Sequence, residues 1–71
     1  MTKREMLIQF LDNDESFTKF HSSNDFVIFK NIHSTNMTIH ISDSDWFTID
    51  GMSYKFENIK LLKGNLYIKL L

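Results

Sequence analysis

The sequence contains no cysteine, no proline and no alanine, and only two glycines among its 71 residues. Without cysteine, the chain can form neither disulfide bonds nor thiolate metal sites, which often support small domains. Stability must therefore come from a hydrophobic core, from self-association or from both. A core can form, because 42% of the residues are hydrophobic and seven are phenylalanine. With both glycines at expected turns, a glycine-rich phosphate-binding loop is not predicted.

Long apolar runs are also missing. The longest ones, residues 6–8 and 26–29, fall far short of the roughly 20 apolar residues that cross a bilayer. Lys3 and Arg4 are not followed by the apolar stretch of a secretory signal. We therefore expect a cytoplasmic protein without a membrane partner.

Acidic and basic residues nearly balance each other, and the net charge is −1 at pH 7. A global electrostatic field therefore does not draw the chain to nucleic acid or to membranes. The charges are nevertheless uneven: seven acidic and two basic residues lie from Asp12 to Asp50, whereas four lysines and one glutamate follow from Gly51 onward. This pattern is typical either of a mixed solvated surface or of a dipolar molecule whose acidic loops meet a basic partner.

A helix is predicted at the start of the chain. Thr2 and Glu5 have the spacing of a capping box, in which each side chain bonds the backbone of the other residue. The apolar residues that follow recur at helical spacing: Met6, Leu7, Phe10 and Leu11. We expect a helix over about 3–13. Two phenylalanines continue this spacing after an acidic break, and they predict a short helical turn over about 15–21.

From residue 26 onward the apolar period changes to two, which predicts short antiparallel strands from about 26 to 70. Residues 26–32 are almost continuously apolar and predict a central strand. Residues 37–42 alternate between apolar and polar and predict a strand with one buried face. The residues between these two strands leave their register open.

The clearest local signal is Asp50-Gly51, a two-residue turn sequence flanked by alternating apolar residues. It predicts a type I′ hairpin, which fixes the pairs of facing residues: Ile49 with Met52, Thr48 with Ser53, Phe47 with Tyr54, and Trp46 with Lys55. Period two then sorts the side chains onto two faces. Phe47 and Tyr54 belong to the core face, whereas Trp46 and Lys55 belong to the polar face.

The alternation slips near residues 57–58, which predicts a bulge or bend. A last hairpin is expected at Gly64-Asn65, and it would pair Leu61 with Ile68 and Ile59 with Leu70. The predicted fold is therefore a single α+β domain over residues 1–71. An N-terminal helix packs on a bent antiparallel meander of five or six short strands, which could also close into a small barrel.

Catalytic and metal-binding patterns are not found. His21, His33 and His40 lack the spacing of a helical metal site, and no cysteine supports them. Asp12-Asn13-Asp14 resembles the opening of a calcium loop, but Phe17 stands where its glycine is needed and Ser23 where its glutamate is needed. We therefore predict a protein that is not an enzyme and needs no cofactor or metal.

Trp46 is the strongest candidate for a binding residue, because the hairpin register puts it on the polar face beside Thr48 and Lys55. An exposed tryptophan is typical of an interface hot spot. Asp43 and Asp45 precede it and would add acidic charge to the same surface. The alternative is that the helix or the chain end covers this tryptophan.

The leading hypothesis is a small non-enzymatic protein-binding module. The absence of alanine and the excess of lysine over arginine are typical of an AT-rich genome. Together with the small size, this favours a modulator or inhibitor of a host protein, encoded by a phage or mobile element and acting in the host cytoplasm. Surplus apolar surface also favours self-association, most simply as a homodimer.

Two alternatives stay open. The first is a single-stranded nucleic-acid-binding domain, in which aromatic and basic residues alternate: Tyr67, Lys60, Lys63 and Lys69. The low net charge makes this alternative weaker. The second is a structural subunit of a homo-oligomer that has no host partner.

Overall fold

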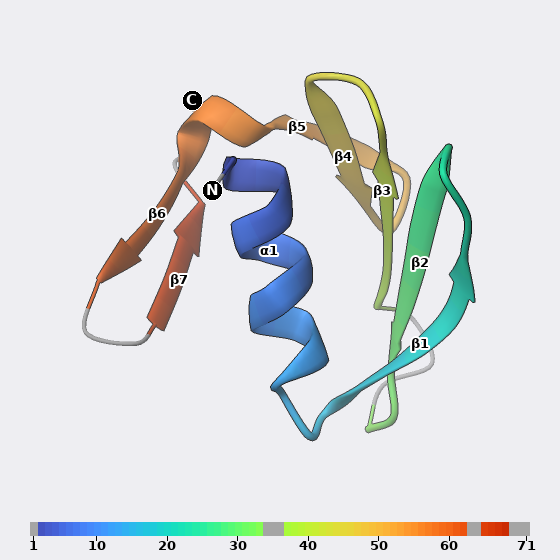
Figure 1. The fold of residues 1–71 in the computed structure, drawn as a ribbon. Coiled ribbons are helices and arrows are strands. Elements are labelled where there is room, and N and C mark those ends of the chain that lie inside the picture. The colour runs from blue at the N-terminus through green and yellow to red at the C-terminus, as the bar shows by residue number, and fades with distance from the viewer. Residues whose placement is uncertain (1, 34–36, 63–64, 69–71) are drawn as a thin grey trace.

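The computed structural model describes residues 2–33, 37–62 and 65–68. Its one α-helix there is α1 (Lys3–Asp12). Five strands follow as one antiparallel meander in chain order: β1 (Phe17–Ser22), β2 (Phe26–Asn31), β3 (Thr38–Ser42), β4 (Trp46–Ile49) and β5 (Met52–Lys55). A short 3-10 helix, η1 (Phe56–Asn58), then leads into a separate hairpin of β6 (Ile59–Leu62) and β7 (Asn65–Ile68) (Figure 1).

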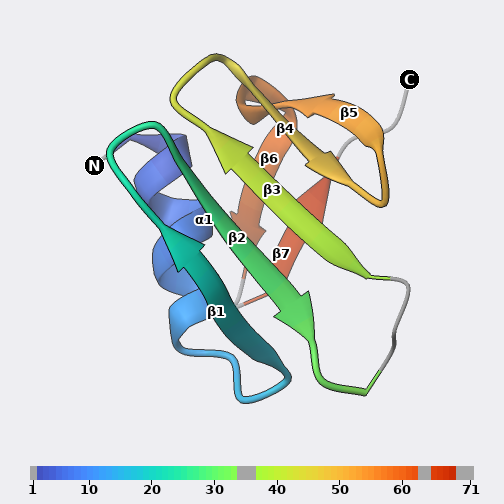
Figure 2. The ribbon, with the colours of Figure 1, turned by 90° about the vertical axis from the view of Figure 1, so that its right-hand side faces the viewer.

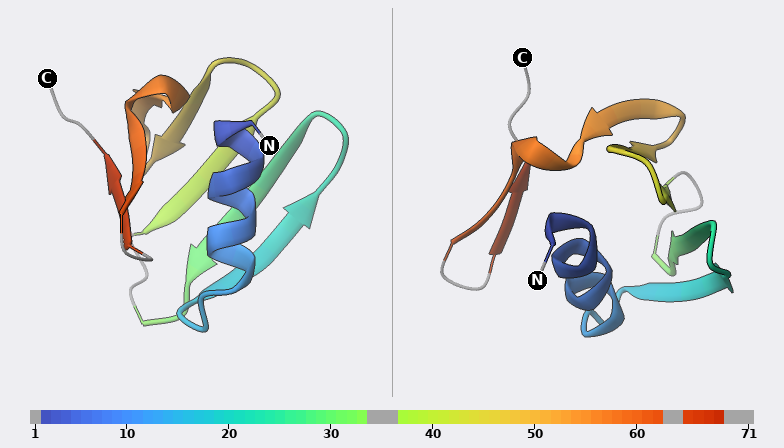
Figure 3. Two further views of the ribbon diagram at one scale, coloured as in Figure 1. Left: turned by 60° about the vertical axis from the view of Figure 1, so that its left-hand side comes forward. Right: turned by 45° about the horizontal axis from the view of Figure 1, so that its top comes forward.

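The helix lies between the two sheets. Figures 1 and 3 show the five-stranded sheet on one side of α1 and the β6–β7 hairpin on the other. The predicted α+β class, with a helix packed on a bent antiparallel meander, is therefore confirmed. The sheet is not closed into a barrel. In the described part of the chain, η1 ends the meander after β5, and β6 pairs with β7 instead of extending the sheet.

The capping box at the start of α1 is confirmed. Thr2 Oγ1 accepts a hydrogen bond from Glu5 N at 3.1 Å, and Glu5 Oε1 accepts one from Thr2 N at 3.2 Å. These bonds satisfy backbone donors that have no partner within the helix. The helix ends at Asp12, one residue before the predicted end.

The pKa of Glu5 lies below its ordinary value of 4.5, mainly because the side chain and backbone of Thr2 donate hydrogen bonds to the carboxylate. A lowered folded-state pKa stabilises the fold above the unfolded pKa, and this contribution is lost as the pH falls through the folded pKa. We therefore expect Glu5→Gln to be less sensitive than the wild type to a change from about pH 6 to about pH 3. Urea unfolding of both proteins at each pH measures this difference, and an identical pH dependence would contradict it.

Residues 17–22 form strand β1, so the predicted helical turn over 15–21 is wrong. After the helix, Asp14 Oδ1 accepts a hydrogen bond from Ser16 N at 2.9 Å, which favours a turn instead of continued helix. The chain then forms β1, which pairs antiparallel with β2 and is an edge strand of the meander.

The spacing of Phe17 and Phe20 explains the error. A separation of three residues puts two side chains on the same side of a helix but on opposite faces of a strand. Phe17 packs against the core, whereas Phe20 is 65% exposed on the other face. A register shift between Lys19 and His21 adds a bulge at this point. The cross-strand bonds to β2 therefore override the local helical pattern.

One hydrophobic core joins the layers. Alternate residues of the strands point toward α1, as period two requires. The buried residues of this core come from the helix, from β2 to β4, from η1 and from β6: Leu7, Leu11, Val27, Phe29, Ile39, Ile41, Phe47, Phe56 and Ile59. The central strands are thus apolar on the helix side, as expected for 26–32 and 37–42.

The β4–β5 hairpin has the predicted register. All four predicted pairs are found, including Phe47 with Tyr54 and Trp46 with Lys55. Asp50 and Gly51 have φ angles of 52° and 82°, and two positive angles are what a type I′ turn requires. The turn sequence therefore decides which side chains of β4 and β5 face away from the core.

The last hairpin forms with a different register from the predicted one. Ile59 pairs with Ile68, and Leu61 pairs with Leu66. The predicted pairs of Ile59 with Leu70 and Leu61 with Ile68 are therefore wrong, by two residues. Leu62 pairs with Asn65, so Asn65 belongs to β7 and not to the predicted turn, and residues 63–64 lie outside the described residues. The predicted bulge near residues 57–58 is the 3-10 helix η1.

Candidate functional site

The five-stranded sheet packs one face on α1. Figure 2 views it from the other side, with α1 behind the strands. The residues between the buried ones point to this side. We call it the outer face, and it consists of Thr18, Phe20, His21, Phe26, Ile28, Lys30, Thr38, His40, Ser42, Trp46, Thr48, Ser53 and Lys55.

Three aromatic rings form a row across the outer face. The Phe26 ring on β2 stacks on His21 of β1, with ring centroids 4.6 Å apart and planes at 17°. On its other side it stacks on His40 of β3, at 4.9 Å and 21°. Stacked rings make a stiff, flat surface that can contact another planar group or an apolar side chain.

Two lysines flank this row, and each lies over an aromatic ring. Lys30 Nζ is 4.0 Å from the centroid of the Phe20 ring, and Lys55 Nζ is 5.2 Å from that of Trp46. Strands β1 to β5 contain no aspartate or glutamate. The carboxylates near the sheet therefore lie in the turns and not on the outer face itself.

Trp46 is 45% exposed, so the helix does not cover it. Its backbone is nevertheless well anchored: Ser42 Oγ donates to Trp46 O at 3.0 Å, and Ser44 Oγ accepts from Trp46 N at 3.4 Å. In the adjoining turn, Phe56 N donates to Asp45 O at 3.1 Å. The indole therefore projects from an anchored backbone at the start of β4, so little backbone entropy is lost when a partner binds it.

A pocket of about 330 Å³ lies at Trp46, lined by Asp45, Trp46, Lys55 and Glu57. Three of these four residues belong to the site predicted from the sequence. Glu57 does not, although its position two residues after Lys55 was the available signal. The pocket combines an aromatic face with two carboxylates and one ammonium group, which suits recognition of a polar or charged side chain. We call it the Trp46 pocket.

The other predicted site residues lie nearby but outside this pocket. Thr48 is on the outer face and pairs with His40 and Ser53. Asp43 is exposed in the turn before β4. The aromatic row was not predicted, because its three rings come together only through the pairing of β1, β2 and β3.

The residues of the alternative nucleic-acid site lie on the separate hairpin. Tyr67 is 52% exposed and pairs with Lys60 across β6 and β7. Lys63 and Lys69 lie outside the described residues. The structure therefore brings together two of the four residues that the sequence suggested for this site.

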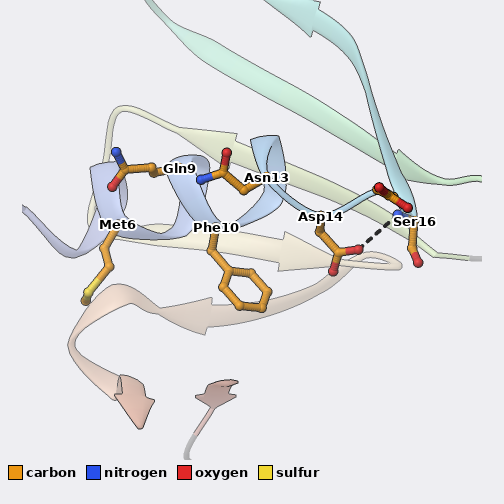
Figure 4. Close-up of a pocket in the computed structure, with 7 residues that line it drawn as sticks. Met6, Gln9, Phe10, Asn13, Asp14 and Ser16 are labelled. Atoms are coloured by element: carbon orange, nitrogen blue, oxygen red, sulfur yellow. Dashed lines mark hydrogen bonds between the residues drawn. The ribbon is translucent and has the colours of Figure 1, made fainter. Parts of the chain in front are cut away.

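A larger groove of about 630 Å³ runs along α1 and the loop that follows it. Met6 and Phe10 project from the helix, while Asp14 and Ser16 come from the loop (Figure 4). The Asp14 carboxylate is already engaged with Ser16 N. Apolar side chains, two amides and the carboxylates of Asp14 and Glu15 line this groove.

Two absences hold for residues 2–33, 37–62 and 65–68, which the structure describes. Histidine, aspartate and glutamate side chains do not gather there in groups of three or more that could hold a metal ion. None of the helical segments in that part of the chain has the length and apolar character needed to cross a membrane.

No family model matches the chain, and neither a curated protein nor a solved structure matches it significantly.

Proposed function

We propose that the protein is a non-enzymatic protein-binding module whose interface is the outer face, centred on Trp46. The observation that carries this proposal is a half-exposed tryptophan at the start of β4, where hydrogen bonds anchor its backbone. Tryptophan is enriched among interface residues that dominate binding energy, and it loses little entropy when a partner covers it. The stacked row of Phe26 with two histidines extends the same surface with further aromatic area.

Negative charge at one end of the sheet favours a basic partner. Asp25, Asp43, Asp45 and Glu57 are exposed in segments at the end where β2 begins and β3 and β5 end. An aromatic centre with a charged rim is the usual anatomy of a protein interface. Such a rim accelerates association with a partner of opposite charge and rejects partners of like charge.

In its concrete form, the protein would be a modulator or inhibitor of a host protein, encoded by a phage or mobile element and acting in the host cytoplasm. The composition supports this origin, with seven lysines to one arginine and no alanine. Exposed apolar residues away from the interface, such as Leu62 on β6, also support self-association as a homodimer.

We expect Trp46→Ala to abolish capture of the main partner from a low-GC bacterial lysate treated with nuclease. Removing a hot-spot side chain costs at least about 2 kcal/mol, or roughly thirtyfold in affinity. Met52→Ala is the matched control, because it also removes an exposed apolar side chain but not one of the outer face. If Trp46→Ala captured the same protein as the wild type, the proposed interface would be wrong.

Single-stranded nucleic acid is the second candidate ligand. Aromatic rings beside lysines, on strands without carboxylates, also favour base stacking and phosphate contacts. Salt separates the two candidates, since nucleic-acid binding weakens steeply as salt is raised, in proportion to the phosphates contacted. Recovery of nuclease-sensitive material that dissociates in high salt would favour this candidate, and capture of nothing but the protein itself would favour a structural subunit.

A further inference from the structure

We infer that the Trp46 pocket receives an arginine side chain of the protein partner, with the guanidinium stacked on the indole and bonded to the carboxylates of Asp45 and Glu57. In the unbound protein, Lys55 occupies part of this place. This inference rests on the proposed protein-binding function and names the partner group that the pocket recognises.

The indole face already holds a cation in the free protein. Lys55 Nζ lies 5.2 Å from the ring centroid of Trp46, within the range of a cation–π contact. The same ammonium is 3.9 Å from Glu57 Oε1, close to the outer limit for an ion pair. The side chains of Lys55 and Glu57 are 46% and 73% exposed, so this pair contributes little to stability. A partner cation can therefore displace Lys55 at small cost.

The carboxylates of the pocket retain capacity for further bonds. Among the described residues, Asp45 makes no ion pair, and Glu57 makes only the long contact with Lys55. Two other cations lie nearby in the first turn of α1, but both bond backbone carbonyls. Lys3 Nζ donates to Glu57 O at 2.8 Å, and Arg4 Nε donates to Ser42 O at 2.7 Å. The pocket thus carries two carboxylates against one ammonium group on its walls.

Guanidinium suits this arrangement better than ammonium. Its plane can lie flat on an indole while its edges donate to carboxylates, and it is less strongly hydrated than an ammonium group. Bonds between guanidinium and carboxylate are charge-assisted, and two carboxylates can bind it from different edges. The volume of about 330 Å³ accommodates a single side chain but not a folded segment.

The probe for this inference is the peptide acetyl-Gly-Arg-Gly-amide, titrated into the full chain and followed by the indole N–H signal in NMR spectra. The protein has one tryptophan, so this signal reports only on the pocket. We expect a saturable shift at concentrations on the order of millimolar. The citrulline peptide, which has the same shape without the charge, should give no saturable shift. Equal binding of both peptides would overturn the inference.

Variants separate a recognition pocket from simple charge attraction. Asp45→Asn combined with Glu57→Gln should weaken arginine binding by about tenfold, since two charge-assisted bonds are lost. Asp12→Asn combined with Glu15→Gln is the charge-matched control, because it removes two exposed carboxylates that do not line the pocket, and it should leave binding unchanged. Lys55→Ala should tighten binding about threefold, because it vacates the indole face. Weaker binding by Lys55→Ala would overturn the displacement of Lys55.

Partner capture distinguishes failure of this inference from failure of the proposed function. If Trp46→Ala loses the partner but the Asp45→Asn, Glu57→Gln variant captures it normally, the interface is right and the arginine pocket is wrong. If Trp46→Ala keeps the partner, the proposed interface itself is wrong. We expect both variants to lose the partner and the wild-type protein to bind the arginine peptide.

Discussion

Phe47→Ala is expected to destabilise the protein by about 3–5 kcal/mol, a large part of the roughly 5–15 kcal/mol that holds a typical domain folded. Phe47 is 1% exposed, and its ring packs against Phe56 and Tyr54 with centroids 5.1 and 5.7 Å away. Alanine would leave a cavity that the surrounding rings cannot fill completely. Urea unfolding followed by circular dichroism measures the loss.

The neighbouring substitution is the matched control. Trp46→Ala removes a larger side chain from the same strand, but this side chain faces outward and is 45% exposed. Its free energy of unfolding should fall by less than about 1 kcal/mol. A similar loss in both variants would mean that the indole belongs to the core, and it would remove the basis for the proposed interface.

The opposite orientations of Phe47 and Trp46 could be predicted from the sequence. Asp50-Gly51 needs positive φ angles that few other pairs adopt, so the turn type and the register of β4 and β5 follow from two residues. Once the register is fixed, period two assigns Phe47 to the core and Trp46 to the outer face. The pairing of Trp46 with Lys55, and hence most of the Trp46 pocket, could therefore be predicted.

Strand β1 could not be predicted, because no turn sequence of that strength marks its pairing with β2. Phe10, Phe17 and Phe20 recur at helical spacing, and the local pattern favoured a helical turn. The strand forms because β2 offers an edge, and Lys19 then reaches back to Asp12 on the helix at 3.1 Å. These are contacts between distant segments, which local periodicity does not contain.

The aromatic row was missed for the same reason. His21, Phe26 and His40 lie on three strands, and they stack only when two separate registers are both correct. The register between β2 and β3 depends on the connection around residues 33–36, whose sequence left it open. The candidate site was therefore predicted where one hairpin builds it and missed where three strands do.

The error in the last hairpin has a simpler cause. The alternation of apolar and polar residues predicts which face of the hairpin each side chain occupies. A shift of the register by two residues leaves every side chain on the same face. Ile59 is buried in the core in the observed register, as it would be in the predicted one. Ile59 of β6 shares the core with Leu7 of α1 and Phe56 of η1. These core contacts join the hairpin to the rest of the fold.

Leu7→Ala should therefore destabilise both sheets together, by about 3–5 kcal/mol. Leu7 is 1% exposed on the helix between the sheets, and it shares one core with Phe29 of β2 and Ile59 of β6. Gln9→Ala is the control, since Gln9 is exposed on the same helix and alanine favours helix formation. Amide hydrogen exchange should show protection falling to a similar extent in β2–β3 and in β6–β7 of Leu7→Ala. Loss confined to β6–β7 would mean that the hairpin opens independently, and the five-stranded sheet would then carry the outer face without it.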